Sequence, residues 1–447
     1  MLLISMIEVY KFGGSILRNS VDIEKILDVV KLSKNRVIIV VSALYQVTDM
    51  LLEILQLSCD KIDYSEKLTY LYNFHKQEEQ QLDCKTDIDL IFDNLKKALH
   101  NCENNAQTKD FIMSFGEVLS SNIMYHFFAK HIDVKFIDSR DVIKTDSCFG
   151  HAKVDFILSN RLIAKNILGF ESHVIMGGFI SSNYDGITTT LGRNGSDYSA
   201  AIVANALNTS LLTMWKDVNG LYSADPKVVS GAYFMDNINY DEIKELACFG
   251  NKIIHIKTIN QLAYRGIPIV IRNLHNLSNK GTLISADSSD KFGIKGVVQL
   301  KNVSIISISL VYNSLNRNEI DQKLKLLFND FRDVIITISE IMMQDKISIL
   351  VNGVYTNDVV QAIEKHFFNI ESVYCNIKVK RNKSIITIVG SNLSNQSGIS
   401  GKIFNALQNN NINVDAIQDD LSETRISFIV DSVDSEKSVK IIHADLF

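Results

Sequence analysis

Residues 191–200 bring together side chains that can bind a small anion. An arginine, a serine and an aspartate (Arg193, Ser196 and Asp197) follow a glycine turn and precede an alanine-rich run that predicts a helix. A guanidinium group binds a carboxylate or a phosphate through two parallel hydrogen bonds. Free N–H groups at the start of a helix also favour an anion, and we expect Ser196 or Asp197 to cap this helix. The segment therefore predicts a site for an anionic small molecule.

A second candidate segment, residues 11–15, follows the first predicted strand. Its two glycines, Gly13 and Gly14, let the backbone approach a ligand closely, and their N–H groups can bind phosphate oxygens. Lys11 can stabilise the charge on a phosphoryl group during its transfer. The alternative is a tight turn beside a solvent-facing lysine. The chain contains no P-loop motif, so a phosphate site here needs a different scaffold.

Several other positions are ambiguous when they are taken alone. Glu117 lies in an apolar helical stretch, where it either faces a buried cation or is exposed, and exposure is the favoured interpretation. Asp217 lies in a turn, where aspartate is common for local reasons. Lys252, near a strand-to-helix junction, is by itself a surface residue, and we assign no catalytic role to His255. The strand end at residues 188–190 leads directly into the anion-binding segment.

The composition limits the class of protein. A chain of 447 residues predicts two or three domains, and 46% hydrophobic with 22% charged residues is typical of globular proteins. The net charge of −5 gives no reason to expect a nucleic-acid partner. The six cysteines show no metal-ligand spacing, which favours reduced thiols. No apolar run reaches the roughly 18 residues that cross a bilayer, and the N-terminus is typical of a strand, so we expect no membrane partner and a cytoplasmic protein.

Residues 6–290 alternate between strand-like and helix-like stretches. Continuous apolar runs predict a mostly parallel sheet that is covered on both faces; they occupy residues 37–41, 134–137, 174–176, 211–215 and 267–271. Ligands of such sheets bind at the carboxyl ends of the strands, so the turns that follow these strands are the expected site. Residues 50–110 show helical spacing throughout, which predicts a helical insertion beside the sheet.

The pattern changes after about residue 294. Strand-like runs occur at residues 303–310, 334–338, 347–351, 384–390, 412–417 and 425–431. Helical runs occur at residues 320–328, 359–367, 397–408 and 435–443. Together they form two passes of a β-α-β-β-α-β pattern of about 70 residues each. We therefore expect an α/β catalytic domain at residues 1–294 and two small α+β regulatory modules at residues 295–382 and 383–447.

Taken in order, these segments resemble the motifs of the aspartate kinases (aspartokinases) of the amino-acid kinase family. The most specific is residues 188–200; residues 11–15, 215–227 and 250–255 appear in the same order. Paired ACT modules are also typical of this family, so the resemblance covers the whole chain. It implies a three-layer amino-acid-kinase sandwich followed by two ferredoxin-like ACT modules. The version of this motif that contains Asn194 resembles the one in the kinase half of the fused aspartokinase–homoserine dehydrogenases.

The resemblance implies that the chain transfers a phosphoryl group from ATP to L-aspartate with Mg²⁺, the first step of lysine, threonine and methionine biosynthesis. Arg193 would bind the α-carboxylate of aspartate, and Glu117 would lie near its ammonium. The implied substrate-binding residues are Thr48, Glu117, Arg193, Asn194, Gly195 and Ser196. The implied ATP-binding residues are Lys11, Phe12, Gly13, Gly14, Lys216, Asp217, Tyr222, Lys227, Lys252 and Ile253. The implied catalytic residues are Lys11, Asp197 and Lys252, with no metal ligand among the side chains.

Some positions depart from the pattern of this family. Lys216 stands where many relatives have threonine, and Lys227 replaces an arginine, which exchanges a bidentate fork for a point charge. Ile256 replaces a proline, so a rigid turn after Lys252 is lost. The turn expected in the first ACT module, residues 310–316, contains no glycine, whereas that in the second, residues 389–398, keeps a recognisable form.

The resemblance also implies lysine or threonine as a feedback effector and a homodimer, or a dimer of dimers, formed through the ACT modules. Two alternatives remain. One is another amino-acid kinase that acts on glutamate, acetylglutamate, carbamate or a nucleotide; residues 191–200 and the ACT pair argue against it. The other is a catalytically weak amino-acid sensor. A complete set of charged residues argues against that second alternative: Lys11, Glu117, Arg193, Asp197 and Lys252.

Overall fold

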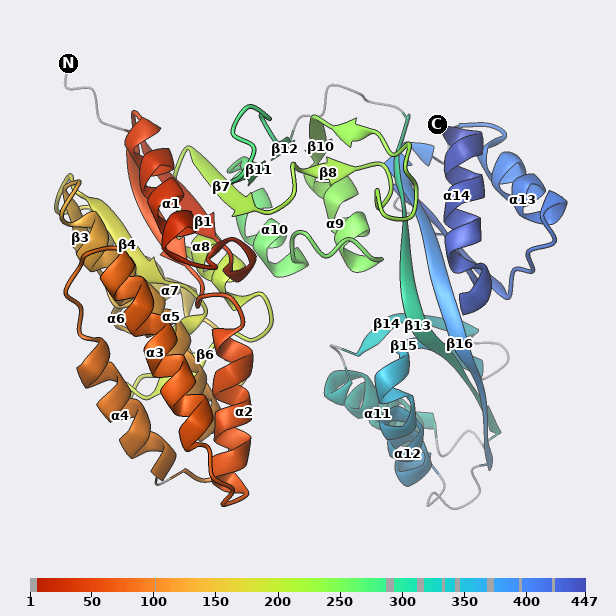
Figure 1. Ribbon diagram of the computed structural model, residues 1–447. Helices are drawn as coiled ribbons and strands as arrows, with labels where there is room; N and C mark the ends of the chain where they lie inside the picture. Colours follow the sequence, from red (N-terminus) through yellow and green to blue (C-terminus); the bar gives the residue numbers. More distant parts are fainter. Residues whose placement is uncertain are drawn as a thin grey trace. The chain divides into compact units, whose positions relative to one another are not determined.

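A computed structural model describes most of the chain (Figure 1). The described residues are 6–100, 102–286, 293–311, 317–331, 334–341, 346–367, 374–393, 396–419 and 423–447. They form two compact units. The first comprises Met1–Leu221, Met235–Tyr240 and Ile253–Ser289, and the second comprises Tyr222–Phe234, Asp241–Lys252 and Asp290–Phe447. The expected single boundary at residue 294 differs from this division, because two earlier segments belong by their contacts to the second unit.

A mostly parallel sheet forms the centre of the first unit, as the apolar runs predict. Its strand order is β10-β12-β11-β7-β1-β2-β4-β3, and within this sheet the one antiparallel pair among the described residues is β11 with β12. The central strands are β1 (Ile7–Phe12), β2 (Arg36–Val41), β4 (His173–Gly177) and β7 (Leu211–Lys216). The flanking strands are β3 (Val134–Phe136), β10 (Asn237–Asn239), β11 (Ile269–Asn273) and β12 (Thr282–Ser285).

Strand β2 shows why the sheet is covered on both faces. All six of its residues are buried. Val37, Ile39 and Val41 belong to the apolar core that the sheet shares with the helices of residues 20–128, whereas Ile38 and Val40, equally buried, point the other way. A continuous apolar run is therefore what this strand requires.

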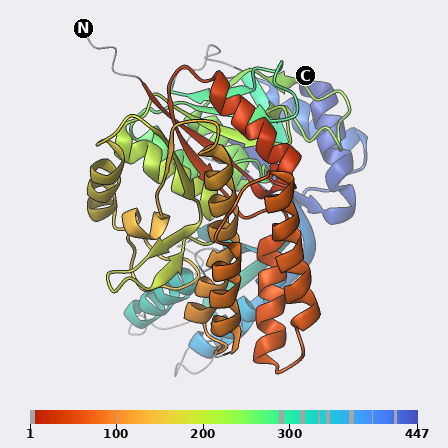
Figure 2. The ribbon, with the colours of Figure 1, turned by 60° about the vertical axis from the view of Figure 1, so that its left-hand side comes forward.

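The expected helical insertion is present. It consists of α2 (Val47–Cys59), α3 (Ser65–Gln81), α4 (Ile88–His100) and the long α5 (Ala106–Phe128). Figure 2 shows these helices, in orange, running alongside one another. Helices α2 and α5 both reach back to the sheet, so their amino-terminal ends can contribute to a site there.

The remaining elements of the first unit connect the strands of the sheet. The helices are η1 (Gly14–Ile16), α1 (Ser20–Leu32), α6 (Ser139–Val142), α7 (Phe156–Ile167), α8 (Gly195–Leu207) and α10 (Ile256–Ala263). Strands β5 (Ile180–Ser182) and β6 (Thr188–Thr190) form a hairpin after β4. Within the described part of the chain, no helix is long and apolar enough to cross a membrane.

The second unit contains one six-stranded antiparallel sheet with the order β14-β15-β13-β16-β18-β17. Two long strands, β13 (Gly293–Val311) and β16 (Tyr374–Ser391), lie side by side at its centre (Figure 1). The outer strands are β14 (Ile335–Ile341), β15 (Lys346–Asn352), β17 (Ala416–Asp419) and β18 (Arg425–Asp431). The two sequential β-α-β-β-α-β passes thus share one sheet.

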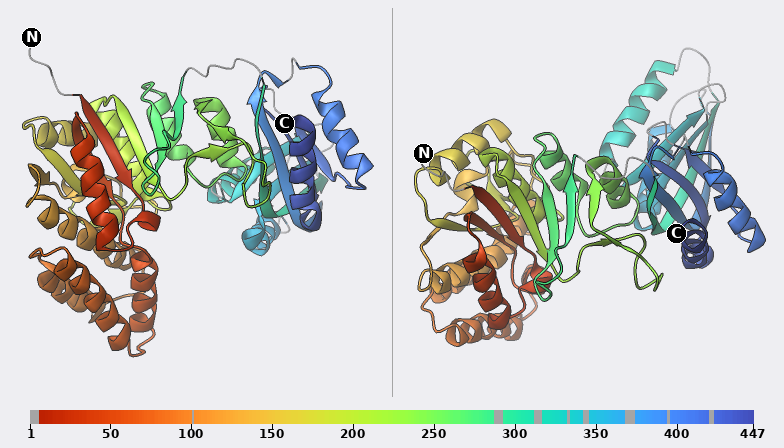
Figure 3. Two further views of the ribbon diagram at one scale, coloured as in Figure 1. Left: turned by 45° about the horizontal axis from the view of Figure 1, so that its top comes forward. Right: turned by 90° about the horizontal axis from the view of Figure 1, so that it is seen from above.

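Two helix pairs cover this sheet and create two apolar cores. Helices α11 (Arg317–Asp330) and α12 (Thr356–Phe367) pack on one half. Helices α13 (Ile399–Asn409) and α14 (Ser435–Leu446), the blue pair in Figure 3, pack on the other half. Shorter elements of this unit are α9 (Tyr240–Cys248), η4 (Gly353–Tyr355) and η6 (Ser432–Asp434), and β8 (Leu221–Tyr222) pairs with β9 (Phe234–Met235).

The second unit differs from the sequence prediction at one strand. The strand expected at residues 412–417 was placed too early, because β17 begins at Ala416 and Ile412 is instead buried in the core beside α13. The turn expected to lack glycine at residues 310–316 falls mostly outside the described residues, as do residues 394–395 of the second turn.

The turn between β11 and β12 makes a prediction about stability. A Cβ at Gly281 (φ +83°) would lie 2.1 Å from the backbone oxygen of Ile271, whereas a Cβ at Gly186 (φ +78°) would meet open space. Both glycine-to-alanine changes strain the backbone by about 1–2 kcal/mol. We expect Gly281→Ala to cost a further 1–3 kcal/mol, roughly, from the collision. Urea unfolding of the two variants measures the difference; equal losses would contradict this account.

Candidate active site

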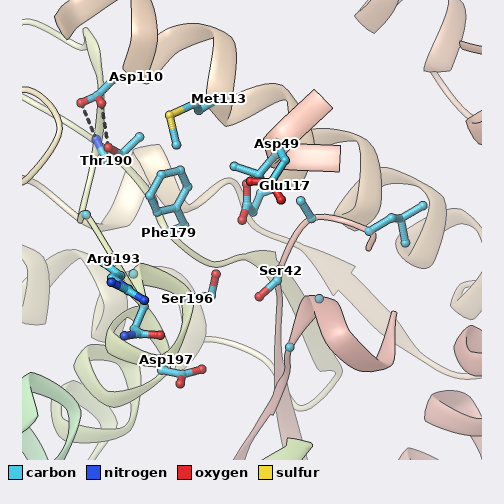
Figure 4. Close-up of a pocket in the computed structure, with 18 of the residues that line it drawn as sticks. Ser42, Asp49, Asp110, Met113, Glu117, Phe179, Thr190, Arg193, Ser196 and Asp197 are labelled. Atoms are coloured by element: carbon cyan, nitrogen blue, oxygen red, sulfur yellow. Dashed lines mark hydrogen bonds between the residues drawn. The ribbon is translucent and has the colours of Figure 1, made fainter. Parts of the chain in front are cut away.

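Four loops meet at the carboxyl ends of the central strands. The register places Phe12 opposite both Val41 and Trp215, and Val41 opposite Gly177. The turns that follow these residues therefore open on one edge of the sheet, as expected for a parallel sheet. A cavity of about 670 Å³ lies there (Figure 4). Its lining includes many of the predicted site residues: Lys11, Gly13, Gly14, Thr48, Glu117, Arg193, Asn194, Gly195, Ser196, Asp197 and Lys216.

The predicted cap of helix α8 is wrong. The helix begins at Gly195 after Asn194, which has a left-handed conformation (φ 58°) and makes no side-chain cap bond. Ser196 and Asp197 lie inside the first turn instead. Asparagine tolerates this conformation better than most residues, so the turn can deliver Asp197 to the interior. The first turn also packs tightly, since a Cβ at Gly178 would lie 2.6 Å from the Cβ of Ser196.

Asp197 lies between two lysines. Lys11 on β1 forms an ion pair with one carboxylate oxygen, and Lys216 on β7 donates a hydrogen bond to the other at 3.0 Å. Burial alone would raise the pKa of Asp197, but the two ammonium groups outweigh it and lower the pKa to about 2. Burial lowers the pKa of Lys11, which Asp197 opposes. The cavity thus contains a permanently ionised, fully paired carboxylate.

Glu117 is the second buried carboxyl group of the cavity and is only 3% exposed. It projects from α5, which lies so close to the turn after β2 that a Cβ at Gly116 would be 2.8 Å from the Cβ of Ala43. Burial raises the pKa of Glu117 to about 8, against the opposing effects of the Ala43 backbone, Lys11 and Ser196. Its Oε2 has no hydrogen-bond partner among the described residues. Figure 4 shows this carboxyl facing the side of the cavity that holds Ser42 and Ser196.

Arg193 and Thr48 also line this cavity. Arg193 is exposed, and no ion pair or hydrogen bond involves its guanidinium within the described part of the chain. An unpaired guanidinium beside a cavity can bind a carboxylate through two parallel N–H···O hydrogen bonds. The cavity therefore offers a free cation at Arg193 and, at Glu117, a buried carboxyl group of which one oxygen has no hydrogen-bond partner among the described residues.

Sequence reasoning missed two residues that shape the cavity. Asp110, which is 1% exposed, accepts hydrogen bonds from Gly150 N (2.9 Å), Thr190 N (2.8 Å) and Thr190 Oγ1 (2.7 Å), and the last two are drawn in Figure 4. Phe179 has a left-handed backbone (φ 64°), and its N–H donates to Ser199 Oγ. The threonine run at residues 188–190 and the two glycines after β4 were the available signals.

The glycine turn after β1 lines the cavity with backbone. A Cβ at Gly13 would lie 3.1 Å from Lys11 Nζ, and one at Gly14 would lie 3.2 Å from the oxygen of Ala43. Phe12 is fully buried and stacks on Trp215, so only its backbone is available to a ligand. Asp217 is exposed just beyond β7, where its carboxylate accepts a hydrogen bond from Ser15 (3.3 Å). Ile253 is described in the first unit but does not line the cavity.

Three of the predicted nucleotide contacts belong to the second unit: Tyr222, Lys227 and Lys252. The side chains of Lys227 and Lys252 are exposed. Tyr222 packs edge-on against Phe234 with ring centroids 5.5 Å apart. Gly250 (φ +142°) lies just before Lys252, where a Cβ would be 2.3 Å from the backbone oxygen of Gln299.

Known protein families and individual relatives match most of the chain. A sequence model of the amino acid kinase family matches residues 6–273, and one of the ACT domain matches residues 386–446. The chain is 29% identical to the bifunctional aspartokinase/homoserine dehydrogenase 2 of Arabidopsis thaliana, which is chloroplastic; the match covers 99% of this chain and 51% of that protein. The chain thus spans about half the length of such bifunctional relatives. It is 27% identical to the lysine-sensitive aspartokinase 3 of Escherichia coli over 99% of this chain and 100% of that protein.

Solved structures show the same fold. The E. coli aspartokinase III in complex with aspartate and ADP has a TM-score of 0.86 at 24% identity, covering 99% of this chain and 100% of that chain. The aspartate kinase of Clostridium acetobutylicum has a TM-score of 0.79 at 26% identity, covering 98% and 100%.

The Lys11–Asp197–Lys216 cluster predicts a large loss of stability when its carboxylate is removed. Asp197→Asn leaves the buried Lys11 and the partly buried Lys216 without their counter-ion, and we expect the free energy of unfolding to fall by about 3 kcal/mol. Glu436→Gln is the control, because Glu436 pairs with Lys301 on the surface, and it should cause no measurable change. Urea unfolding compares the two. A loss for Asp197→Asn no larger than that of the control would contradict the assignment.

Proposed function

The chain belongs to the amino acid kinase family, and we propose that it transfers the γ-phosphoryl group of ATP to the side-chain carboxylate of L-aspartate. One observation carries the proposal: the free guanidinium of Arg193 and the buried carboxyl of Glu117, whose Oε2 has no partner among the described residues, line the same cavity as the Lys11–Asp197 pair. An amino acid with a second carboxylate matches that set of charges. The similarity to aspartokinases over nearly the whole chain supports the same substrate.

The acceptor is bound by complementary charges. Arg193 binds the α-carboxylate of aspartate, and Glu117, once ionised, binds its ammonium group. Ser196 lies beside Glu117 and supplies a hydroxyl to the same ligand. Thr48, Asn194 and Gly195 contribute to the remaining walls of this substrate site.

The chemistry needs no general base. The side-chain carboxylate of aspartate is already ionised at neutral pH, so one of its oxygens attacks the γ-phosphorus directly while the bond from that phosphorus to the β-phosphate bridging oxygen breaks. The products are 4-phospho-L-aspartate and ADP. Lys11 and the N–H groups of Gly13 and Gly14 stabilise the charge on the transferred group. Asp197 holds Lys11 in place, so the chain's contribution is alignment and neutralisation of charge.

The nucleotide is proposed to contact Lys216, Asp217, Tyr222, Lys227, Lys252 and Ile253 in addition to the turn after β1. Mg²⁺ in kinases is held by phosphate oxygens and one or two carboxylates, and it offsets phosphate charge. No cluster of three metal-ligating side chains occurs among the described residues, and Asp197 is already paired with lysines. The residues therefore fit a metal ion that arrives bound to ATP and is held mainly by phosphate oxygens, and no side chain is assigned to it as a ligand.

The second unit is proposed to regulate the enzyme. Its ACT match and the E. coli aspartokinase III structure in complex with lysine and aspartate support lysine as an effector, with threonine as the alternative. We also propose that the chain forms a homodimer, or a dimer of dimers, through this unit. The cytoplasmic location stays a prediction, since the bifunctional relative from Arabidopsis thaliana is chloroplastic.

Substitution of Arg193 tests the acceptor site. In an aspartyl-hydroxamate assay with ATP and Mg²⁺, we expect the chain to turn over aspartate but not glutamate. Arg193→Ala should raise the KM for aspartate roughly 10- to 100-fold and leave the KM for ATP unchanged, because a charge-assisted hydrogen bond to the acceptor is lost. Arg161→Ala, an exposed arginine on α7 outside the cavity, is the matched control. Turnover of glutamate in place of aspartate would refute the proposal.

Glu117 predicts how aspartate affinity depends on pH. In the empty cavity the raised pKa of about 8 keeps Glu117 protonated at pH 7, so binding of an ammonium group must release its proton. We therefore expect the KM for aspartate to fall as the pH rises from 6 to 8 and then to level off. Calorimetry at pH 7 in two buffers of different ionisation enthalpy should detect the released proton.

The matched variant for this prediction is Glu117→Gln, which keeps the shape but cannot ionise. It should raise the KM for aspartate roughly tenfold and abolish both the pH trend and the proton release. A wild-type KM that does not change between pH 6 and 8 would contradict the role of Glu117.

A further inference from the structure

We propose that His443, on helix α14 of the second unit, is a positioning residue for ATP. It holds Ser223 in place and thereby orients the segment Tyr222–Phe234, which carries Tyr222 and Lys227. This inference rests on the proposed function, because those two residues are taken as nucleotide contacts. The hydrogen bonds and core packing that hold the segment are independent of that assumption.

The segment is built into the apolar core of the second unit. Ala224 is 2% exposed and belongs to the same core cluster as Val297 of β13 and Phe428 of β18. Val228 and Val229, on the far side of Lys227, pack against that cluster. A surface loop has no need of such anchors, so the sheet and helices of this unit determine where the segment lies.

Hydrogen bonds of Ser223 hold the start of the segment in place. Its backbone oxygen accepts a hydrogen bond from Val297 N at 2.7 Å. Its N–H donates to the oxygen of Tyr233, and its Oγ accepts from Tyr233 N, both at 2.8 Å. The contact with β13 is close, since a Cβ at Gly296 would lie 3.1 Å from the oxygen of Ser223.

His443 completes this network from α14. Its Nε2 lies 2.8 Å from Ser223 Oγ. Because Ser223 Oγ already accepts the N–H of Tyr233, its own proton is available to Nε2 of a neutral imidazole. The His443 ring is 4% exposed and stacks on Tyr233 (centroids 6.0 Å apart) and on Phe447 (4.5 Å). Ring orientation and hydrogen bond therefore fix one another.

The geometry links this network to Lys227. The turn that carries Lys227 is closed by hydrogen bonds from Val228 N (2.8 Å) and Val229 N (2.9 Å) to the oxygen of Asp225, and Lys227 N donates to Asp225 Oδ1 (2.9 Å). Ser223 lies two residues before this turn and directly after Tyr222. Loss of the His443 hydrogen bond leaves the Ser223 side chain held only by Tyr233 N, so the start of the segment is less ordered and the nucleotide must restore that order when it binds.

The effect should be selective for the nucleotide. All residues that line the cavity assigned to aspartate belong to the first unit, and none of them contacts His443 or Ser223 among the described interactions. A positioning role thus predicts that the KM for ATP changes and the KM for aspartate does not. A general loss of structure would change both.

The test measures ATP affinity and turnover separately for His443→Ala. We expect the dissociation constant and the KM for ATP to rise roughly 5- to 10-fold, the effect of one hydrogen bond, with the KM for aspartate within twofold of the wild type. Ser223→Ala, which removes this hydrogen bond and the one from Tyr233 N, should raise both constants at least as much, and the double variant should cost less than the sum of the two single effects because they share one interaction. His443→Gln, which can still accept from Ser223 Oγ, should recover most of the affinity.

Lys440→Ala, on the exposed face of the same helix, is the matched control and should behave as the wild type. Unchanged ATP affinity in both His443→Ala and Ser223→Ala would overturn the inference, as would an equal change in both KM values. Direct calorimetry with ATP alone separates the two proposals. Wild-type protein that binds ATP without phosphorylating aspartate sinks the proposed reaction but still allows this test, whereas wild-type protein that does not bind ATP sinks both.

Discussion

The buried carboxylate of Asp197 is the constraint on which the site depends. A charge that is 3% exposed must be paired, and here the partners come from two adjacent strands, Lys11 on β1 and Lys216 on β7. The chain satisfies this requirement by starting α8 at Gly195, after a left-handed Asn194, so that Asp197 lies in the first turn and reaches inward. The left-handed turn before α8 therefore places one carboxylate within reach of two lysines.

The same cavity holds a second carboxyl group in the opposite state. Two cations hold the pKa of Asp197 near 2, whereas burial raises that of Glu117 to about 8. Environments that shift the pKa values of two carboxyl groups in opposite directions give the two groups different roles. Asp197 is already neutralised and serves to hold lysines. In the proposed reaction Glu117 gains its charge when the ammonium group of the acceptor enters, which would favour an amino acid over a simple dicarboxylate.

The sequence predicts those parts of the fold that depend on local patterns. Buried parallel strands need continuous apolar runs, so β2, β4 and β7 were recognisable, and their shared edge located the cavity. Asp110 could not be predicted as a site residue, because its role depends on a hydrogen bond with Thr190, eighty positions away in the chain. The shared sheet of the second unit escaped for a related reason. Strand patterns do not reveal pairing partners, and only the register of β13 with β16 shows that two passes form one sheet.

The anchoring of the Tyr222–Phe234 segment has an energetic consequence for regulation. An effector shifts an affinity only by the difference in its own binding free energy between two states of the protein. Because Ala224 belongs to the apolar core of the second unit and Val228 and Val229 pack against it, a rearrangement of that core would be transmitted to the residues beside Lys227. A change of about 1.4 kcal/mol in the order of this segment alters ATP affinity tenfold. If this segment binds ATP as proposed, an effector needs only a few additional contacts in one state, because the Tyr222–Phe234 segment and the core of the second unit share their packing.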